Sequence, residues 1–286
     1  MESRIIIQSL LLSSILSVFW LPTALCADPL VSTCSQTANY TANSPLEINL
    51  KALLNSFPQD TSTSGFFNGS LGDDPNDQIY MQAMCRGDLT QNQCKFCIKN
   101  ACQEIFKLCK TMDAIIWMES CQVRYSYSMF FSSMTYAGRY IDNEGKTKVD
   151  PAKSSAVLWG LIDELSYQAA YNDSRKMFAV GKTKMSGNKA MYGLVQCTRD
   201  ISPDDCRSCL NSAFTDLDGC CSALQGGMIV SNNCVMRFEM YRFYNITAVN
   251  GMITFPFAEP KISYCLAYLK RKYFHYPSLS TRWRLD

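Results

Sequence analysis

The spacing of the cysteines constrains the fold of this 286-residue chain more than any other feature. Four of them recur later in the chain at one constant shift, and a fifth recurs one position beyond that shift. The first set is Cys85, Cys94, Cys97, Cys109 and Cys121, and the second is Cys197, Cys206, Cys209, Cys221 and Cys234. Because five cysteines keep almost one shift, we expect a tandem duplication in which two copies of one module share a fold.

Each copy carries the signals of two helices. In the first copy, Ser44-Pro45-x-Glu47 and Thr90-x-x-Gln93 are helix starts with capping residues, and Asp150-Pro151 and Ser202-Pro203-x-Asp205 take their places in the second copy. Apolar residues follow each start at helical spacing. They are Leu46, Leu50, Leu53, Leu54 and Phe57, then Cys94, Cys97, Ala101, Ile105 and Leu108, and in the second copy Leu158, Leu161, Ile162 and Leu165, then Cys206, Cys209, Leu210, Ala213 and Leu217.

The apolar period changes from 3.6 to 2 after the second helix of each copy. A short apolar run comes first, at residues 114–118 and 228–230, and alternation follows in residues 122–129 and 236–241. Such patterns indicate antiparallel strands with one buried face. The predicted fold class is therefore α+β, with two tandem disulfide-stapled modules, each made of two helices packed on a small antiparallel β-sheet. Modules of about 100 residues bury a modest core, so disulfides are a plausible supplement.

The two ends of the chain set the expected boundaries. Residues 1–27 combine Arg4, an apolar stretch and small residues near Cys26, as a cleaved signal peptide does. The apolar stretch is shorter than the ~20 residues that a bilayer needs. The first module is expected at 28–135, the second at 136–248, and a C-terminal tail at 249–286. The tail has no counterpart in the first copy.

Several features predict a secreted, extracellular protein without a transmembrane anchor. The chain has 15 cysteines, and removal of Cys26 leaves an even number that can pair in an oxidising compartment. Four glycosylation sequons begin at Asn39, Asn68, Asn172 and Asn245. The 27 basic residues nearly balance 25 acidic ones, which gives no electrostatic reason to expect nucleic acid as a partner.

The residues that could carry catalysis do not form a recognisable site. The single histidine, His275, lies in the tail, and Asp73, Asp74 and Asp77 stand in a Gly/Asn/Pro-rich stretch typical of a solvated loop. The Cys-x-x-Cys pairs of the two copies are compatible with redox pairs or half of a zinc site, but also with two structural bonds to distant partners. We favour the structural interpretation and predict no enzymatic activity, no cofactor and no metal.

The spacing Cys-x8-Cys-x2-Cys resembles the plant cysteine-rich repeat module, also called domain of unknown function 26 or the ginkbilobin-2-homologous, stress-antifungal domain. The motifs Cys85-Arg86-Gly87-Asp88, Cys220-Cys221 and Arg237-Phe238-Glu239 belong to the same resemblance, which covers residues 30–245. Two such modules after a signal peptide are similar to the cysteine-rich repeat secretory proteins. This resemblance implies an apoplastic protein of stress, defence or signalling whose partner is a cell-wall glycan, a microbial glycan or a receptor ectodomain.

The resemblance also implies a disulfide scheme that spacing alone does not select. The implied pairs are Cys34–Cys109, Cys85–Cys94, Cys97–Cys121, Cys197–Cys206 and Cys209–Cys234. At the shift that relates the cysteines of the two copies, Lys146 stands where the first copy has Cys34. The pairing of Cys102, Cys220, Cys221 and Cys265 stays open, including a bond from Cys220 or Cys221 to Cys265. Cys102 matches Phe214 on the equivalent helix, so a buried free thiol is the simple interpretation and a functional thiol the alternative.

Mannose-binding antifungal members of the family use an Asn after the first cysteine, an Arg in the next strand and a Glu five residues after the last cysteine. These positions hold Ser35, Ile115 and Ser126 in the first copy, whereas Met228 and Glu239 take the second and third positions in the second copy. Glu239 is thus the one candidate sugar-binding residue, and the alternative is a solvent-side strand residue beside Arg237. A direct antifungal lectin and an extracellular enzyme remain the alternatives to a binding protein of other specificity.

Overall fold

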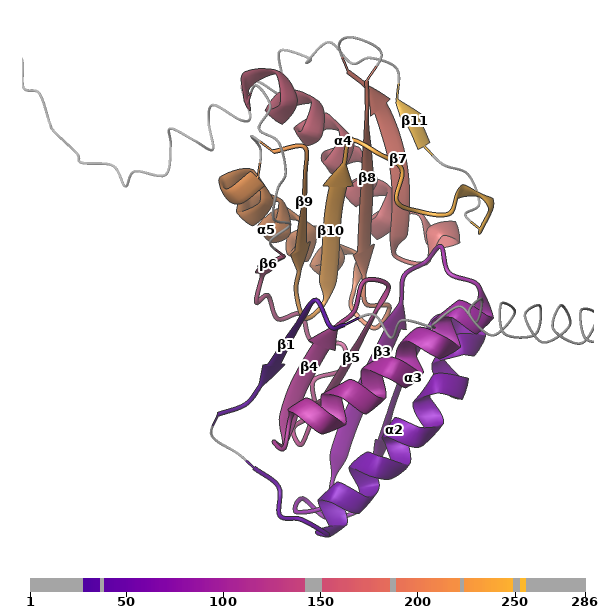
Figure 1. Cartoon of the computed structure of the whole chain (residues 1–286), viewed down its shortest axis with the longest axis vertical. Coiled ribbons are helices and arrows are strands. Elements are labelled where there is room, and N and C mark those ends of the chain that lie inside the picture. The colour runs from indigo at the N-terminus through magenta and orange to yellow at the C-terminus, as the bar shows by residue number, and fades with distance from the viewer. Residues whose placement is uncertain are drawn as a thin grey trace, which may run out of the picture.

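The computed structural model describes residues 28–36, 39–141, 151–185, 189–221, 224–248 and 253–255. The expected signal peptide, most of the expected tail, His275 and Cys265 lie outside the described residues. Within them the chain forms two α+β modules, as predicted, and these stack along the long axis of the molecule (Figure 1).

The first module places two helices against one face of a five-stranded sheet (Figure 1). Its strands are β1 (Val31–Cys34), β2 (Phe66–Leu71), β3 (Ile79–Cys85), β4 (Asp113–Trp117) and β5 (Cys121–Ser126), and its helices are α2 (Pro45–Ser64) and α3 (Gln91–Leu108). The strand order is β1-β4-β5-β3-β2, and each neighbouring pair is antiparallel.

The second module repeats this arrangement. Its strands are β6 (Arg139–Ile141), β7 (Phe178–Lys184), β8 (Ala190–Cys197), β9 (Gly226–Val230), β10 (Cys234–Glu239) and β11 (Ile253–Phe255), and its helices are α4 (Pro151–Tyr171), η1 (Asp173–Arg175), α5 (Pro203–Cys221) and η2 (Ile246–Ala248). The order β6-β9-β10-β8-β7 matches that of the first sheet. Strand β11 is an addition that pairs in parallel with β7, so the expected tail contributes an edge strand.

The predicted capping residues of the first module begin its two helices, while Asp150 lies outside the described residues. The Ser44 hydroxyl accepts the Glu47 N–H at 3.3 Å at the start of α2. At the start of α3, Thr90 and Gln93 form a reciprocal capping box. Helix α2 ends at Gly65, whose φ of +82° is a left-handed conformation that glycine adopts without steric cost. These local signals explain why the helix starts could be located from the sequence.

The sequence patterns located fewer strands than the structure contains. Strands β2 and β3, and their counterparts β7 and β8, lie before the helix that carries Cys-x-x-Cys, and the sequence patterns did not predict them. Leu108 was expected on the buried face of α3 but is 49% exposed. Tyr127 and Met129 were expected to continue the alternation, but β5 ends at Ser126 and both side chains are exposed.

Comparison of burial in the two copies shows where the second copy is longer. The buried positions of α4 match those of α2 when Leu158 is aligned with Leu50. In the strands that follow, Phe66 pairs with Met84 as Phe178 pairs with Gln196. Phe66 therefore aligns with Phe178 at a slightly larger shift, which is the shift that also relates the cysteines. The second copy therefore has a short insertion between these elements, and it includes η1.

The insertion changes the alignment of the first cysteine. Ile141 pairs with Met228 in the second sheet as Thr33 pairs with Ile115 in the first. Thr33 therefore aligns with Ile141, at the same smaller shift that aligns Leu50 with Leu158. The position of Cys34 therefore aligns in sequence with Asp142 and not with Lys146, which the cysteine shift had suggested. Both Asp142 and Lys146 lie outside the described ranges.

The modules pack on each other through the sheet faces that the helices leave uncovered. A buried apolar cluster joins the two sheets there, and its core is formed by Ile115, Trp117, Ile141, Met228 and Val230. The Trp117 Nε1–H donates to the Ser231 carbonyl at 3.1 Å across the contact. Each sheet thus has two covered faces at this end, which explains why polar strand residues such as Gln122 and Gln196 are buried.

Candidate functional site

Five disulfides tie the helices and strands of the described modules together. They join Cys34 to Cys109, Cys85 to Cys94, Cys97 to Cys121, Cys197 to Cys206, and Cys209 to Cys234, the same pairs that the resemblance implied. In each Cys-x-x-Cys the two sulfurs belong to different bonds, so neither pair is a dithiol redox couple. Among the described residues, no group of three or more His, Cys, Asp or Glu could hold a metal ion.

The remaining described cysteines differ in state. Cys220 is bonded to its neighbour Cys221, with 3.8 Å between their Cα atoms, in place of the bond to Cys265 that the sequence left open. Cys102 is a free thiol in α3 and is 4% exposed. Burial raises the pKa of Cys102 to about 12. Such a thiol stays protonated at neutral pH, which favours the simple interpretation over a functional thiol.

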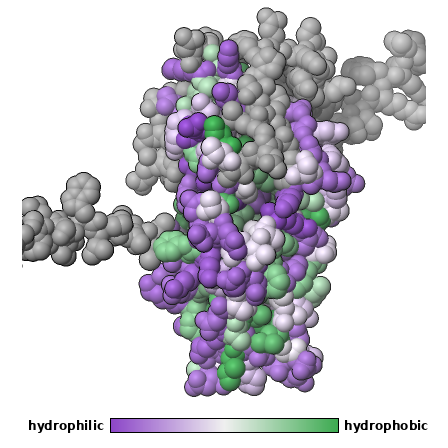
Figure 2. Space-filling model, turned by 90° about the vertical axis from the view of Figure 1, so that its right-hand side faces the viewer, coloured by the Kyte–Doolittle hydropathy of each residue, from purple (hydrophilic) through white to green (hydrophobic). Residues whose placement is uncertain are grey.

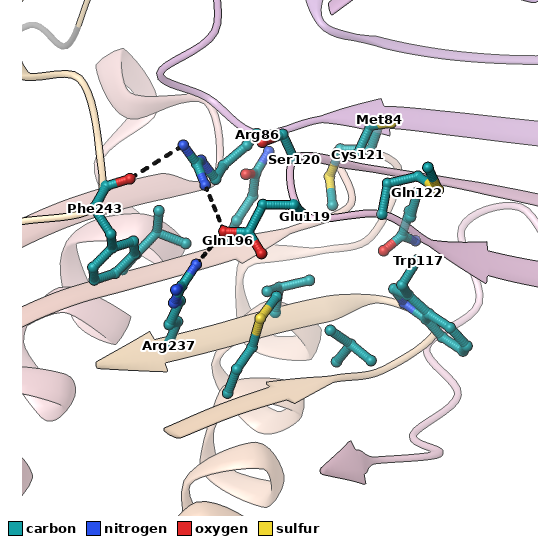
Figure 3. A pocket seen from close by; sticks show the side chains of 15 residues that line it. Met84, Arg86, Trp117, Glu119, Ser120, Cys121, Gln122, Gln196, Arg237 and Phe243 are labelled. Atoms are coloured by element: carbon teal, nitrogen blue, oxygen red, sulfur yellow. Dashed lines mark hydrogen bonds and ion pairs between the residues drawn. The ribbon is translucent and has the colours of Figure 1, made fainter. Parts of the chain in front are cut away.

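A charged network lies where the modules meet. Figure 3 shows Glu119 of the first module between Arg86 and Arg237, and it forms ion pairs with both. Arg237 Nε also donates to Glu239 at 3.0 Å, and Arg86 Nε donates to Asp88 at 2.6 Å. Burial acts to lower the pKa of Arg237, but the carboxylates of Glu119 and Glu239 outweigh it and the pKa is raised.

This network corrects the interpretation of Glu239 as a solvent-side residue. Glu239 is 1% exposed and Arg237 is 9% exposed, because the first module covers this end of the sheet. The Arg237 guanidinium also stacks on Phe243, 4.4 Å from the ring centroid. A sugar could not reach the Glu239 carboxylate without separating these groups.

Three of the other mannose positions are also closed, whereas Ser35 is partly exposed. Ile115 and Met228 are 6% exposed and belong to the apolar cluster between the sheets. Ser126 is 2% exposed, and its hydroxyl is 3.2 Å from the Asp113 carboxylate. The pocket of Figure 3 has a volume of about 30 Å³, which suits a water molecule but not a sugar.

Main-chain contacts complete the junction. The Gln196 side chain donates to the Cys85 carbonyl at 2.9 Å and accepts the Gly87 N–H at 3.2 Å. A Cβ at Gly87 would lie 2.4 Å from Phe178, so only glycine permits this approach. Sequence reasoning missed Gln196 and Glu119, although Gly87 in the Cys-Arg-Gly-Asp motif was a signal of a close backbone approach.

A second cavity opens on the helix side of the second module, between α4 and α5. Its volume is about 180 Å³. Its lining is formed by Trp159, Ile162, Asp163, Ser166, Arg207, Asn211 and Phe214. Arg207 forms an ion pair with Asp163, and its guanidinium also donates to the Asp163 carbonyl at 2.8 Å. The sequence patterns gave no signal of this cavity, which we call the α4–α5 groove, because its polar residues come from two separate helices.

The four sequons occupy different environments. Asn39 and Asn245 are exposed, whereas Asn68 in β2 and Asn172 before η1 are partly buried. At Asn172 and Asn245 the hydroxyl two residues later donates to the asparagine Oδ1 at 2.7 Å. Asp73, Asp74 and Asp77 lie in the turn between β2 and β3, where the Asp77 carboxylate accepts the Asp74 N–H at 2.9 Å. No helix among the described residues is long and apolar enough to cross a bilayer.

These features define a tandem, cysteine-rich α+β protein in which two copies of one disulfide-bonded module dock through their sheets. The chain belongs to the salt stress response/antifungal family, whose family model matches residues 33–128 and 143–241. The predicted family and fold class are thereby confirmed. This family is a family of cysteine-rich ectodomains and not a known family of enzymes.

The chain is similar to named relatives over most of its described length. It is 34% identical over 206 residues to cysteine-rich repeat secretory protein 38 of Arabidopsis thaliana. The matched region covers 72% of this chain and 81% of that protein. It is also 34% identical over 219 residues to the antimicrobial ginkbilobin-2-like protein of Castanea crenata, covering 76% and 90%. The solved tandem DUF26 ectodomain of the Arabidopsis thaliana cysteine-rich receptor-like protein PDLP5 matches with a TM-score of 0.60 and 25% identity, covering 75% of this chain and 100% of that one.

Proposed function

We propose that this chain is a secreted, non-enzymatic recognition protein of the plant apoplast that binds a glycan or a receptor ectodomain in stress, defence or signalling. The observation that carries the proposal is the burial of the sheet faces between the modules. Their charged and polar residues are engaged with each other, as in the contacts of Glu119 and Gln196. The helices of both modules are left on the outside, where a partner has access to them.

An extracellular location fits the predicted signal peptide and the predicted sequons. It also fits the name of the Arabidopsis relative, which describes a secretory protein. Disulfides such as Cys34–Cys109 persist in an oxidising compartment, whereas cytosolic thiols would reduce them.

A non-enzymatic role is supported by the chemistry of the buried groups. The acidic residues at the junction are held in ion pairs with arginines, and Cys102 is protonated at neutral pH. The Cys102 thiol therefore cannot act as a general base near pH 7.

The Castanea relative is named as an antimicrobial protein. Antimicrobial action by this chain would need a binding route other than Glu239, because that carboxylate is buried against Arg237. We therefore place recognition on the outer surface. Figure 2 shows one outer face as mostly hydrophilic with separate hydrophobic patches on the half that belongs to the first module.

The test is a binding screen of the full mature protein, secreted and oxidised. Glycan arrays and a panel of receptor ectodomains should give at least one saturable ligand, and the same protein should leave wall polysaccharides uncleaved. Binding should be lost after reduction, because the modules depend on their disulfides. Absence of any ligand in both screens, or turnover of a wall polysaccharide, would contradict the proposal.

A further inference from the structure

We infer that the α4–α5 groove is a saccharide site that holds one neutral sugar ring. The inference rests on the proposed function, since it names the ligand class and the place where recognition occurs. Its basis is the combination of an aromatic wall, paired donors and acceptors, and a cavity of matching size in one place.

The aromatic wall is formed by one residue from each helix. The rings of Trp159 in α4 and Phe214 in α5 meet edge to face, with centroids 5.9 Å apart and planes at 87°. Trp159 is partly exposed, and it lines the groove together with Phe214. Aromatic rings offer a large apolar surface at low entropic cost, which suits the C–H face of a pyranose.

The polar residues of the groove offer both donors and acceptors. Asp163 presents acceptor oxygens and Arg207 presents N–H donors, while Asn211 and Ser166 provide groups of both kinds. A sugar hydroxyl donates one hydrogen bond and accepts others, so a mixed lining fits it better than a single-sign lining. The ion pair of Arg207 with Asp163, and its bond to the Asp163 carbonyl, fix the guanidinium before a ligand arrives.

The charge balance selects a neutral ligand. A phosphate or uronate site needs a cation that is free to pair with the anion. Here the Arg207 guanidinium is already paired with the Asp163 carboxylate, so an added anion would meet that carboxylate as well. A neutral hexose ring avoids this repulsion.

The size of the cavity limits the ligand to a single ring. Its volume of about 180 Å³ is below the roughly 300 Å³ at which pockets for drug-sized ligands begin. Further along α4, Tyr167 and Tyr171 are 55% and 42% exposed, with ring centroids 5.2 Å apart. Tyr171 is anchored by a 2.8 Å hydrogen bond to Asp204, one turn before Arg207 on α5. These rings provide a surface for the next sugar of a chain.

The first module does not repeat the groove. Its two helices contact each other more extensively than α4 and α5 do. At the aligned positions, Lys51 replaces Trp159, Lys95 replaces Arg207 and Cys102 replaces Phe214. Lys51 instead forms an ion pair with Glu47 at 3.2 Å, and Lys95 donates to Gln59 at 2.7 Å. The first copy thus supplies matched control positions.

The experiment uses the secreted, oxidised full-length protein and a neutral glycan array, followed by titration of the best glycan. Trp159→Ala and Arg207→Ala should each weaken binding about tenfold or more, as expected when a stacked ring or a charge-assisted hydrogen bond is lost. The matched variants Lys51→Ala and Lys95→Ala in the first module should stay within about twofold of the unchanged protein. Thermal unfolding of each variant separates loss of the site from loss of the fold.

A second measurement does not require replacing Trp159 by alanine. The glycan should change the tryptophan fluorescence of a Trp283→Phe protein, which removes the tryptophan of the expected tail. Adding Trp159→Phe, which keeps an aromatic ring, should abolish most of that change because Trp117 is buried between the modules. If a glycan binds equally well to folded Trp159→Ala and Arg207→Ala, or if only a receptor ectodomain binds, the groove assignment is wrong and the proposed function stands. If neither glycan nor ectodomain binds, the proposed function fails together with the assignment.

Discussion

The two modules are built from the same parts but use them differently. Both have the strand order of the first sheet and an arginine of the last long strand stacked on a phenylalanine, Arg124 on Phe130 and Arg237 on Phe243. In the second module that arginine is paired with two carboxylates, whereas in the first module burial lowers the pKa of Arg124 and its Nη1 has no hydrogen-bond partner. The duplicated scaffold therefore kept its geometry while the polar contacts diverged.

The helix pairs on the outer faces of the two modules also differ in how closely they pack. In the first module the helices pack closely and present lysines, and in the second module they part at a groove with an aromatic wall. The lesson is that disulfides and sheets fix the common frame, and that the outer helix faces are where two copies can acquire separate roles.

The largest expected effect comes from the disulfide that the described part of the second module lacks. Cys34–Cys109 closes a loop of 75 residues, and its removal by Cys34→Ser with Cys109→Ser should lower the free energy of unfolding by about 4.5 kcal/mol. Cys85–Cys94 closes only 9 residues, and its removal should cost about 2.5 kcal/mol. Urea denaturation of both variants measures the difference. Equal losses would show that loop length does not set the contribution of these bonds.

The next effect tests the divergent arginines. Arg237→Ala removes the guanidinium that pairs with the buried Glu239 carboxylate and should cost about 3 kcal/mol in free energy of unfolding. Arg124→Ala, the matched change in the first module, removes a stacked arginine from a strand that has Ser126 at the position of Glu239, and it should cost about 1 kcal/mol. Denaturation curves give both values.

A second change separates loss of the ion pair with Glu239 from loss of packing around Phe243. Arg237→Met combined with Glu239→Gln removes both charges and should recover most of the loss caused by Arg237→Ala. If the double variant is as unstable as the single one, packing around Phe243 and not the lost ion pair with Glu239 accounts for the effect.

The smallest effect concerns the buried thiol of Cys102 in the first helix pair, which has Phe214 at the aligned position of the second pair. The ordinary pKa of a cysteine thiol near 9.0 is raised by burial to about 12 in Cys102, and the aligned Phe214 has no titratable group. Below pH 9 the thiol is protonated in both states, so its contribution to stability is complete. As the pH rises above 9 the unfolded chain releases this proton and the folded chain keeps it, and the free energy of unfolding should fall by about 1.4 kcal/mol per pH unit.

Cys102→Ala provides the comparison. Urea denaturation at pH 8 and at pH 10 should show a smaller fall in stability for Cys102→Ala than for the unchanged protein. Identical falls would mean that other groups, such as the tyrosines, account for the whole pH dependence.

The sequence predicted the features that local chemistry encodes. Capping residues such as Thr90 located the helices, and the cysteine shift revealed the duplication. Strand β3 was missed because both of its faces are buried: Ile79, Met81 and Ala83 face the helices, while Gln82 is covered although it is polar. A pattern of alternating apolar and polar residues describes a half-exposed strand and gives no sign of this case.

The candidate sites were harder to predict because they depend on contacts between distant segments. Arg237 and Glu239 have the composition of a solvent-facing pair, and only the docking of the first module makes them buried. The insertion at η1 also displaced the alignment of everything before it, which is why the cysteine shift matches Lys146 with Cys34. The α4–α5 groove joins residues of two helices, and no single stretch of sequence contains it.

The way Gln196 holds the first module has an evolutionary consequence. Its amide contacts the backbone oxygen of Cys85 and the backbone nitrogen of Gly87, and backbone atoms are the same whatever amino acid supplies them. Mutations on the outer helices of the first copy can therefore accumulate without disturbing this attachment, provided that Gly87 and the docked side chains of Trp117 and Glu119 stay. A lineage carrying this arrangement is free to change the specificity of one half while the other half remains joined to it in the same orientation.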